Sequence, residues 1–216
     1  MRSAPELWYH PLRKAGMEMQ QERGAGAALA AAAAWLGAGV LLSGAAPGGG
    51  EAAAWAWQSL TALVQAAAGV LTARAAGLDR KGFGLTRPGP GGLAPALCCL
   101  AVAAVSGLLL PPETGLALHA GGGVRVLAWL RLCPVAALCE ELVFRGAVQG
   151  LAAGLGGWST AVQAVLFAAA HGIGPGGLYA LGFGLGLGWL RRRTGSLWPG
   201  VLLHGLNNWA LFCMQG

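Results

Sequence analysis

From residue 25 onward, the chain is a series of apolar stretches separated by short segments that hold most of the charges. Several stretches reach about 20 residues, the length that an α-helix needs to cross the hydrocarbon core of a bilayer. Only 10% of the residues are charged and 56% are hydrophobic, whereas a water-soluble domain carries roughly 25% charged residues. The sequence therefore predicts an all-α protein, a polytopic transmembrane helix bundle.

Hydropathy divides the apolar part of the chain into about seven predicted spans. They cover residues 25–46, 52–73, 92–110, 127–150, 158–174, 177–190 and 196–213. Three regions follow from this division: a cytoplasmic N-terminal segment (1–24), a first group of transmembrane spans (25–110) and a C-terminal transmembrane core (111–216), which holds nearly all of the intramembrane polar residues.

Basic residues in the connecting segments predict the orientation, because Lys and Arg accumulate in short cytoplasmic loops. Three clusters fall on one side if the N-terminus is cytoplasmic: Arg2, Arg13, Lys14 and Arg23; Arg74, Arg80, Lys81 and Arg87; and Arg191, Arg192 and Arg193. The opposite side would hold only Glu51, Glu113 and Arg125. The net charge of +6 is thus assigned mainly to topology, and the thin scatter of basic residues argues against a nucleic-acid partner.

Glu140 and Glu141 are adjacent acidic residues in the middle of an apolar stretch, where ionisable groups are costly and indicate function. Arg145 follows Glu141 by four residues, which places the two on one face of a helix. Arg145 can therefore neutralise Glu141. Glu140 then has no partner in its own helix, which suits a general base that activates water. The competing interpretation is a structural ion network that locks helices together.

Two further polar pairs have the same i, i+4 spacing, Phe167 with His171 and His204 with Asn208. Imidazole and carboxamide groups can donate hydrogen bonds to an oxyanion, and an imidazole beside a carboxylate can hold and polarise a water molecule. The sequence lacks the residues that other kinds of intramembrane hydrolytic site require. No HExxH motif occurs, and an aspartyl dyad is impossible because Asp79 is the only aspartate.

These residues fall into three ordered motifs, EExxxR (Glu140 to Arg145), FxxxH (Phe167 to His171) and HxxxN (His204 to Asn208). Together they resemble the CPBP intramembrane proteases, also called the CAAX protease and bacteriocin-processing or Abi family, which is related to the Rce1-type prenyl-protein endopeptidases. The resemblance covers residues 127–213, and the three earlier spans match no family pattern.

The resemblance implies a role for each motif residue. Glu140 and His171 would activate the attacking water, His204 and Asn208 would stabilise the oxyanion, and Glu141, Arg145 and Phe167 would support the site. No cofactor is expected. A divalent metal stays open as an alternative, since two histidines, an asparagine and a glutamate can bind one, but no local ligand spacing demands it.

Cys139, directly before the paired glutamates, is similar to the myxosortase-like branch, whose members process proteins with a C-terminal sorting tail. Two interpretations of this residue remain open: a small apolar packing residue, or a nucleophile that uses His171 as its base in a transpeptidase reaction. The helical direction of Cys139 differs from that of Glu140 by about 100°, so both could border one cavity.

We therefore predict an intramembrane endopeptidase of a bacterial inner (plasma) membrane. Its substrate would be a membrane-anchored polypeptide, cleaved at a peptide bond that enters a cavity between the fourth, fifth and seventh spans. His171 is expected near the outer end of the fifth span, whereas Glu140 lies about ten residues into the fourth, so either the fifth helix is longer or tilted or the site lies toward the outer half of the bilayer. The alternatives are a Cys139-dependent sorting transpeptidase and a non-catalytic immunity or scaffold protein that binds a peptide in the same pocket.

Overall fold

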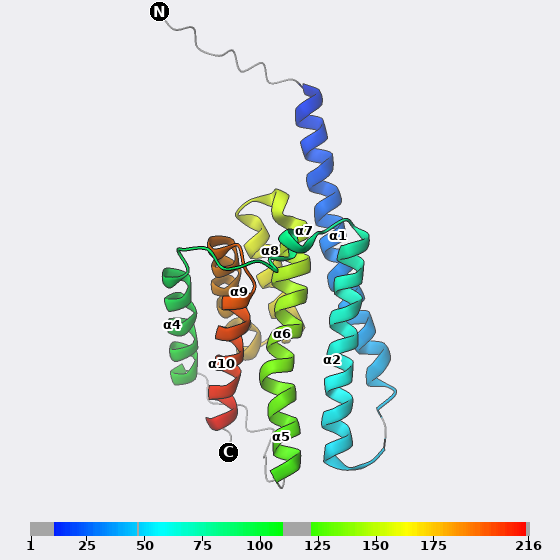
Figure 1. Ribbon diagram of the computed structural model, residues 1–216, viewed down its shortest axis with the longest axis vertical. Helices are drawn as coiled ribbons and strands as arrows, with labels where there is room; N and C mark the ends of the chain where they lie inside the picture. The colour runs from blue at the N-terminus through cyan, green and yellow to red at the C-terminus, as the bar shows by residue number, and fades with distance from the viewer. Residues whose placement is uncertain (1–10, 47, 110–121, 215–216) are drawn as a thin grey trace, which may run out of the picture.

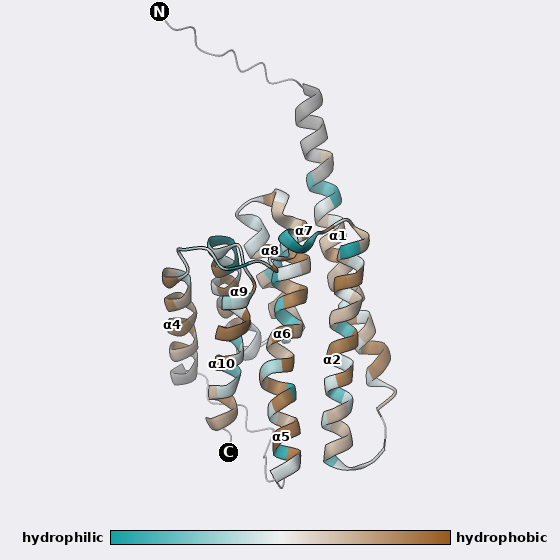
Figure 2. Ribbon diagram, in the orientation of Figure 1, coloured by the Kyte–Doolittle hydropathy of each residue, from teal (hydrophilic) through white to brown (hydrophobic). Residues whose placement is uncertain are grey.

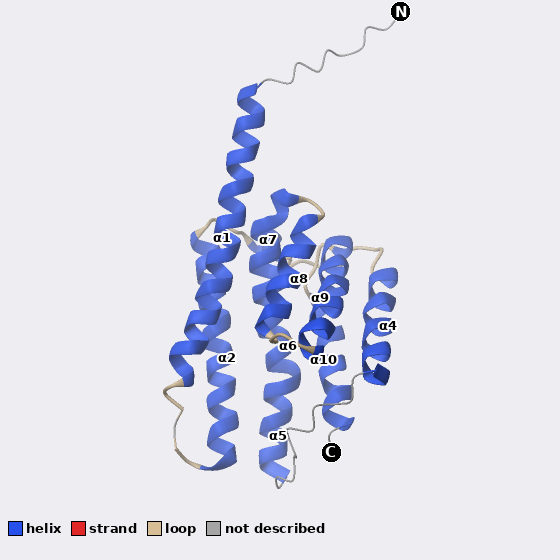
Figure 3. Cartoon of the chain, turned by 180° about the vertical axis from the view of Figure 1, so that it is seen from behind, coloured by secondary structure: helices blue, strands red, loops and turns tan. Residues whose placement is uncertain are grey.

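The computed structural model describes residues 11–46, 48–109 and 122–214, and every regular element in these ranges is a helix (Figures 1 and 3). The all-α class is therefore confirmed. The elements are α1 (Pro11–Ser43), α2 (Gly50–Ala75), α3 (Arg80–Phe83), α4 (Leu93–Leu109), α5 (Gly122–Leu130), η1 (Arg131–Val135), α6 (Ala136–Glu140), η2 (Glu141–Val148), α7 (Gln149–Leu151), η3 (Ala152–Leu155), α8 (Trp158–Ala170), α9 (Pro175–Thr194) and α10 (Trp198–Met214).

Only one helical stretch in the described ranges is both long and apolar enough to cross a membrane by itself. It is Gln21–Ser43 in α1, with a mean hydropathy of 1.9, and Leu93–Val105 and Trp158–Ala170 are shorter apolar helices. The seven predicted spans and the cytoplasmic N-terminus stay predictions. The first ten residues of the predicted segment 1–24, and Glu113 of the predicted outer loop, lie outside the described residues.

The structure shifts several predicted boundaries. The predicted span 158–174 ends as a helix at Ala170, because Gly172 and Gly174 adopt φ values of 89° and 149° and Pro175 begins the next helix. The stretch predicted at 177–190 is longer, since α9 continues through Arg191, Arg192 and Arg193 to Thr194. Basic residues in a last helical turn interact favourably with the helix dipole, so they do not end α9.

The central element runs from α5 to α7, residues 122–151, and lies between α2 and α10 (Figures 1 and 3). Around it, α1 packs along α2, and α8 packs along α9. Helix α4 lies at the edge of the bundle, where it packs against α9 (Figure 1). Helices α8 and α9 are joined by a short turn, which makes them antiparallel neighbours. The turn between α8 and α9 therefore lies at one end of the bundle, and the opposite ends of both helices lie at the other end.

Two segments of the central element are wound as wider π-helical turns. The first, η1, contains Pro134, which lacks the backbone N–H that an α-helix would use. The second, η2, begins at Glu141 and includes Arg145, and both side chains are almost fully buried. Single π-helical segments inside α-helices often occur at functional sites. The second wide turn thus begins at one of the paired glutamates, Glu141, and directly follows the other.

Apolar side chains cover much of the bundle surface. Leu41 is 80% exposed and Val40 64% exposed at the end of α1, and Leu202 on α10 is 66% exposed. Figure 2 shows apolar residues along the length of the long helices, while hydrophilic residues gather at the end where the segment between α2 and α4 crosses the bundle. An apolar exterior of this kind suits a lipid environment.

Candidate active site

The paired glutamates lie on different sides of the central helix. Glu141 is 1% exposed, and one nitrogen of Arg145, Nη1, lies 2.9 Å from its Oε1. Glu140 has a side chain that is 20% exposed and lines a cavity of about 440 Å³. The ion pair predicted between Glu141 and Arg145 is therefore present, and within the described residues Glu140 forms no ion pair with a lysine or arginine.

Two histidines from separate helices meet the Glu140 carboxylate. Glu140 Oε2 lies 4.0 Å from His171 Nε2 and 3.7 Å from His204 Nε2. His171 directly follows α8, whereas His204 belongs to the middle of α10. The structure thus brings together one residue from each of the three sequence motifs, although the motifs are separated by long stretches of chain.

Hydrogen bonds determine the tautomer of each neutral histidine. His171 Nδ1 lies 2.8 Å from the carbonyl oxygen of Phe167, which can only accept, so Nδ1 carries the proton and Nε2 presents a lone pair toward Glu140. His204 Nδ1 lies 3.0 Å from Glu141 Oε1, and the carboxylate likewise requires the proton on Nδ1. His204 can donate from Nε2 only as an imidazolium.

Phe167 sits at the centre of the motif residues. Its ring centroid lies 4.2 Å from the guanidinium carbon of Arg145 and 4.4 Å from the ring centroid of His171. It also meets the rings of Phe144 and His204 edge-on. Among the described residues no acceptor is aligned with the guanidinium N–H groups of buried Arg145, so the Phe167 ring face and the Glu141 carboxylate together balance its charge.

Asn208 is held by a chain of hydrogen bonds. Its Nδ2 donates to the carbonyl oxygen of Leu132 over 3.0 Å, and its Oδ1 accepts from Asn207 over 3.3 Å. The hydroxyl of Tyr179 in turn donates to Asn207 Oδ1 over 2.7 Å. One of the two Nδ2 hydrogens of Asn208 remains available for a ligand in the cavity.

Sequence reasoning did not identify Tyr179 and Asn207, although both line the cavity with Asn208. Asn207 directly precedes a motif residue, and Tyr179 is one of only two tyrosines in the chain. A tyrosine hydroxyl inside an apolar helix bundle usually needs a hydrogen-bond partner, and this is the one signal that could have identified Tyr179. Its partner lies on another helix, so the pairing is not visible in the sequence.

Cys139 lies apart from the cavity. Its side chain is 3% exposed and packs in a hydrophobic cluster that includes Ala62 and Ala66 of α2 together with Phe144. The residues that line the cavity include Glu140 but not Cys139. The arrangement therefore resembles the packing interpretation of this cysteine more closely than the nucleophilic one.

A metal centre is another arrangement that the motif residues could form. Within the described ranges, no group of three or more His, Cys, Asp or Glu side chains is arranged to hold a metal ion. Glu140, His171 and His204 come nearest to such a set, through the 4.0 Å and 3.7 Å separations given above. Two of them present lone pairs in their neutral forms, so these three residues are the ones that would hold a metal.

Comparison with known proteins identifies one segment of the chain. Residues 122–210 match the model of the family described as Rce1-like, type II CAAX prenyl endopeptidase Rce1-like. The matched segment holds all three motifs, and the predicted relationship to the CPBP and Rce1-type family is confirmed for this segment. The similarity to the myxosortase-like branch stays a prediction. No match to the chain was found among curated proteins or among solved structures.

A glycine on α10 makes room for the buried carboxylate. A methyl group at Gly200 would lie 2.8 Å from Glu141 Oε2, whereas at Gly205, on the same helix, the nearest atom would be Ala137 Cβ at 3.8 Å. We expect Gly200→Ala to lower the free energy of unfolding by about 1–3 kcal/mol through overpacking. Gly205→Ala is the matched control and should unfold like the wild type. Thermal unfolding in detergent measures both, and equal midpoints would contradict the expectation.

Proposed function

Since residues 122–210 form an Rce1-like domain, we propose that the protein is an intramembrane endopeptidase that hydrolyses a peptide bond in a membrane-anchored polypeptide. The observation that carries the proposal is the convergence of the Glu140 carboxylate with the Nε2 atoms of His171 and His204 at one cavity. A structural ion network would account for Glu141 and Arg145, but it would give Glu140 no role.

In the first step, Glu140 and His171 activate water. A water molecule can lie within hydrogen-bond distance of two acceptors that are 4.0 Å apart, and donate one hydrogen to Glu140 Oε2 and the other to His171 Nε2. Glu140 takes a proton as the water oxygen attacks the scissile carbonyl carbon. The Glu140 carboxylic acid then passes this proton to the amine that leaves.

The second requirement is a group that stabilises the oxyanion of the tetrahedral intermediate. Protonated His204 can donate from Nε2, with Glu141 holding its Nδ1–H, and Asn208 can donate its second Nδ2 hydrogen. His204 and Asn208 are one turn apart on α10, so a single oxyanion can lie within reach of both. The Tyr179–Asn207 chain keeps the Asn208 amide in this orientation.

The position of the site favours an exported substrate. The cavity is formed by the end of α8 and the beginning of α9, opposite to the end of α9 that carries Arg191, Arg192 and Arg193. If the basic residues face the cytoplasm, as the distribution of Lys and Arg predicts, the site lies in the outer half of the membrane. A C-terminal sorting tail of the kind processed by the myxosortase-like branch fits this position better than a cytoplasmic prenylated protein does.

The proposed topology has about seven spans in a bacterial inner membrane, with the catalytic core between 111 and 216. Support comes from the arrangement of the basic residues, because Lys81 from the segment after α2 and Arg191 from α9 line one cavity at one end of the bundle. Short helices such as α8 then cross only part of the bilayer, as irregular helices do where they border a protein cavity.

Removal of the general base tests the proposal. Glu140→Gln keeps the shape of the side chain, and we expect it to lower the rate of substrate processing by about 10²–10⁴-fold, the usual contribution of general acid–base catalysis. Glu51→Gln, an exposed change at the start of α2, is the matched control. The rate of processing is measured by counting precursors that retain a membrane segment, in the membrane and secreted proteomes of cells that carry each variant at equal protein level. Normal processing with Glu140→Gln would refute the role of Glu140.

The cysteine alternative has its own test. Because Cys139 is buried away from the cavity, we expect Cys139→Ala to keep processing within about twofold of the wild type, as a small packing change does. The same precursor count measures it. Loss of processing at normal protein level would instead support a Cys139-dependent transpeptidase.

Chelation distinguishes the two ways of activating water. If glutamate and histidine activate water without a metal, we expect processing by the purified protein to be unchanged after dialysis against EDTA, because the reaction then uses no metal ion that EDTA could remove. A loss that is restored by added Zn²⁺ would show that Glu140, His171 and His204 hold a metal. Protein dialysed in parallel against the same buffer without EDTA controls for activity lost during dialysis.

A further inference from the structure

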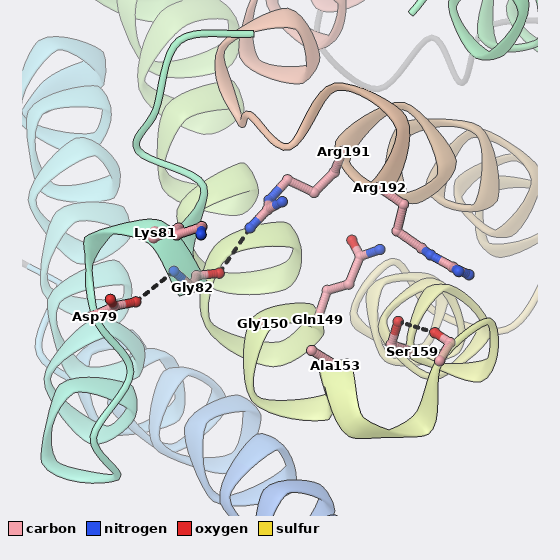
Figure 4. A pocket seen from close by; sticks show the side chains of 10 residues that line it. Asp79, Lys81, Gly82, Gln149, Gly150, Ala153, Ser159, Arg191 and Arg192 are labelled. Carbon is pink, nitrogen blue, oxygen red and sulfur yellow. Dashed lines mark hydrogen bonds between the residues drawn. The ribbon is translucent and has the colours of Figure 1, made fainter. Parts of the chain in front are cut away.

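A second cavity, of about 430 Å³, lies at the other end of the α8 and α9 pair (Figure 4). Its walls come from α3, the segment from α7 to η3, the first turn of α8 and the last turns of α9. No residue of this cavity belongs to the catalytic site, and none of the three sequence motifs contributes to it. The cavity therefore needs its own explanation.

Three cationic side chains line this cavity, Lys81, Arg191 and Arg192. Within the described part of the chain, none of them forms an ion pair. The one acidic residue of the lining, Asp79, uses its Oδ1 to accept the Gly82 N–H at 2.7 Å, which caps α3. The cavity thus presents an excess of positive charge.

The guanidinium of Arg191 is held in place before any ligand binds. Its Nη2 donates to the carbonyl oxygen of Gly82 over 2.8 Å, as the dashed line in Figure 4 shows. Gly84, at a φ of 75°, lets the backbone come so close to Arg191 that a Cβ at this position would collide with the guanidinium. A positioned arginine loses less side-chain entropy when it binds an anion.

Gln149 places at this cavity a hydrogen-bond acceptor that has no partner within the described ranges. Its side chain is 4% exposed, and its Nε2 donates to the carbonyl oxygen of Gly188 over 2.9 Å and to Thr160 Oγ1 over 3.2 Å. The Gly188 carbonyl can only accept, which fixes the orientation of the amide. Gln149 Oε1 therefore points elsewhere and has no partner among the described residues. Figure 4 shows this amide between Arg191 and Arg192.

A buried acceptor without a partner costs free energy, so it calls for a ligand that donates a hydrogen bond. The three cations call for an anion, and arginine suits phosphate in particular. One ligand meets both demands if it carries a phosphate next to a hydroxyl group. We propose that this cavity binds the headgroup of an anionic phospholipid of the phosphatidylglycerol type, with its phosphate at Lys81, Arg191 and Arg192 and a glycerol hydroxyl donating to Gln149 Oε1.

A lipid is favoured over a free phosphate ester by the location. The cavity lies at the hydrophilic end of an apolar bundle (Figure 2), next to exposed basic residues such as Arg193. Basic pockets between helices on the cytoplasmic side of membrane proteins bind anionic headgroups. The proposal rests on this topology and is independent of the hydrolytic chemistry. A bound headgroup would join α3, α7 and α9, segments that are far apart in the sequence.

The test compares lipids that differ in one property. Full-length protein is placed in nanodiscs of three compositions. The first is phosphatidylcholine alone, the second contains about 20% phosphatidylglycerol, and the third contains the same share of phosphatidylmethanol, which has the same charge but no headgroup hydroxyl. Thermal unfolding and lipid retention in native mass spectrometry are measured. We expect the highest midpoint and retention with phosphatidylglycerol, intermediate values with phosphatidylmethanol and the lowest with phosphatidylcholine alone. Equal values for the two anionic lipids would overturn the role of Gln149.

Two variants separate the cavity from the general charge of this surface. Arg192→Gln should weaken retention of phosphatidylglycerol about tenfold, the loss that corresponds to one charge-assisted hydrogen bond. Arg193→Gln is the matched control, because the neighbouring Arg193 does not line the cavity and lies near the Trp189 ring instead. Lys81→Gln provides a second lining variant if Arg192→Gln folds poorly. Equal retention by all variants would refute the site.

A soluble ligand distinguishes the source of the phosphate. Glycerol phosphate is added to the protein in neutral detergent, and the unfolding midpoint is compared with that in the presence of phosphatidylglycerol. We expect no stabilisation by glycerol phosphate at concentrations where the lipid stabilises. Stabilisation by glycerol phosphate that Arg192→Gln removes would show that the cavity takes a free phosphate ester, and would overturn the lipid proposal.

Discussion

The buried carboxylate of Glu141 joins the central helix to α10, and the geometry of the site depends on it. One oxygen, Oε1, meets both Arg145 within the same helix and His204 on α10. Breaking such a buried pair typically costs about 3–5 kcal/mol, because a charge is left without compensation. Glu141 therefore holds His204 at the distance from which it can face Glu140, and it also selects the tautomer of that ring.

Aromatic and small residues complete this arrangement. The Phe167 ring lies against Arg145 on one side and beside His171 on the other, so the three motifs share a common packing centre. Gly200 lets α10 approach the Glu141 carboxylate. A charged network of this kind is tolerated in an apolar bundle only when every charge has a partner, and here a ring face serves where hydrogen-bond acceptors are lacking.

The antiparallel pairing of α8 and α9 separates two cavities in space. The turn between the helices carries His171 and opens the proposed catalytic cavity, while the opposite ends of the same helices carry Ser159, Arg191 and Arg192 at the basic cavity. Hydrolysis and headgroup binding would thus occur at opposite ends of one rigid pair. Contacts at the basic end can influence the position of α9, which also supplies Tyr179 to the catalytic cavity.

The sequence by itself determined the helical class, the ion pair between Glu141 and Arg145 and the identity of the motif residues, because helical spacing and the scarcity of intramembrane charges are local properties. Only the tertiary structure decided that His171 and His204 meet Glu140, that Cys139 turns toward α2, and that Tyr179 and Asn207 hold Asn208. It also brought Lys81 to the arginines of α9. These contacts join segments distant in the chain, and their pairing depends on how whole helices pack, which no local pattern encodes.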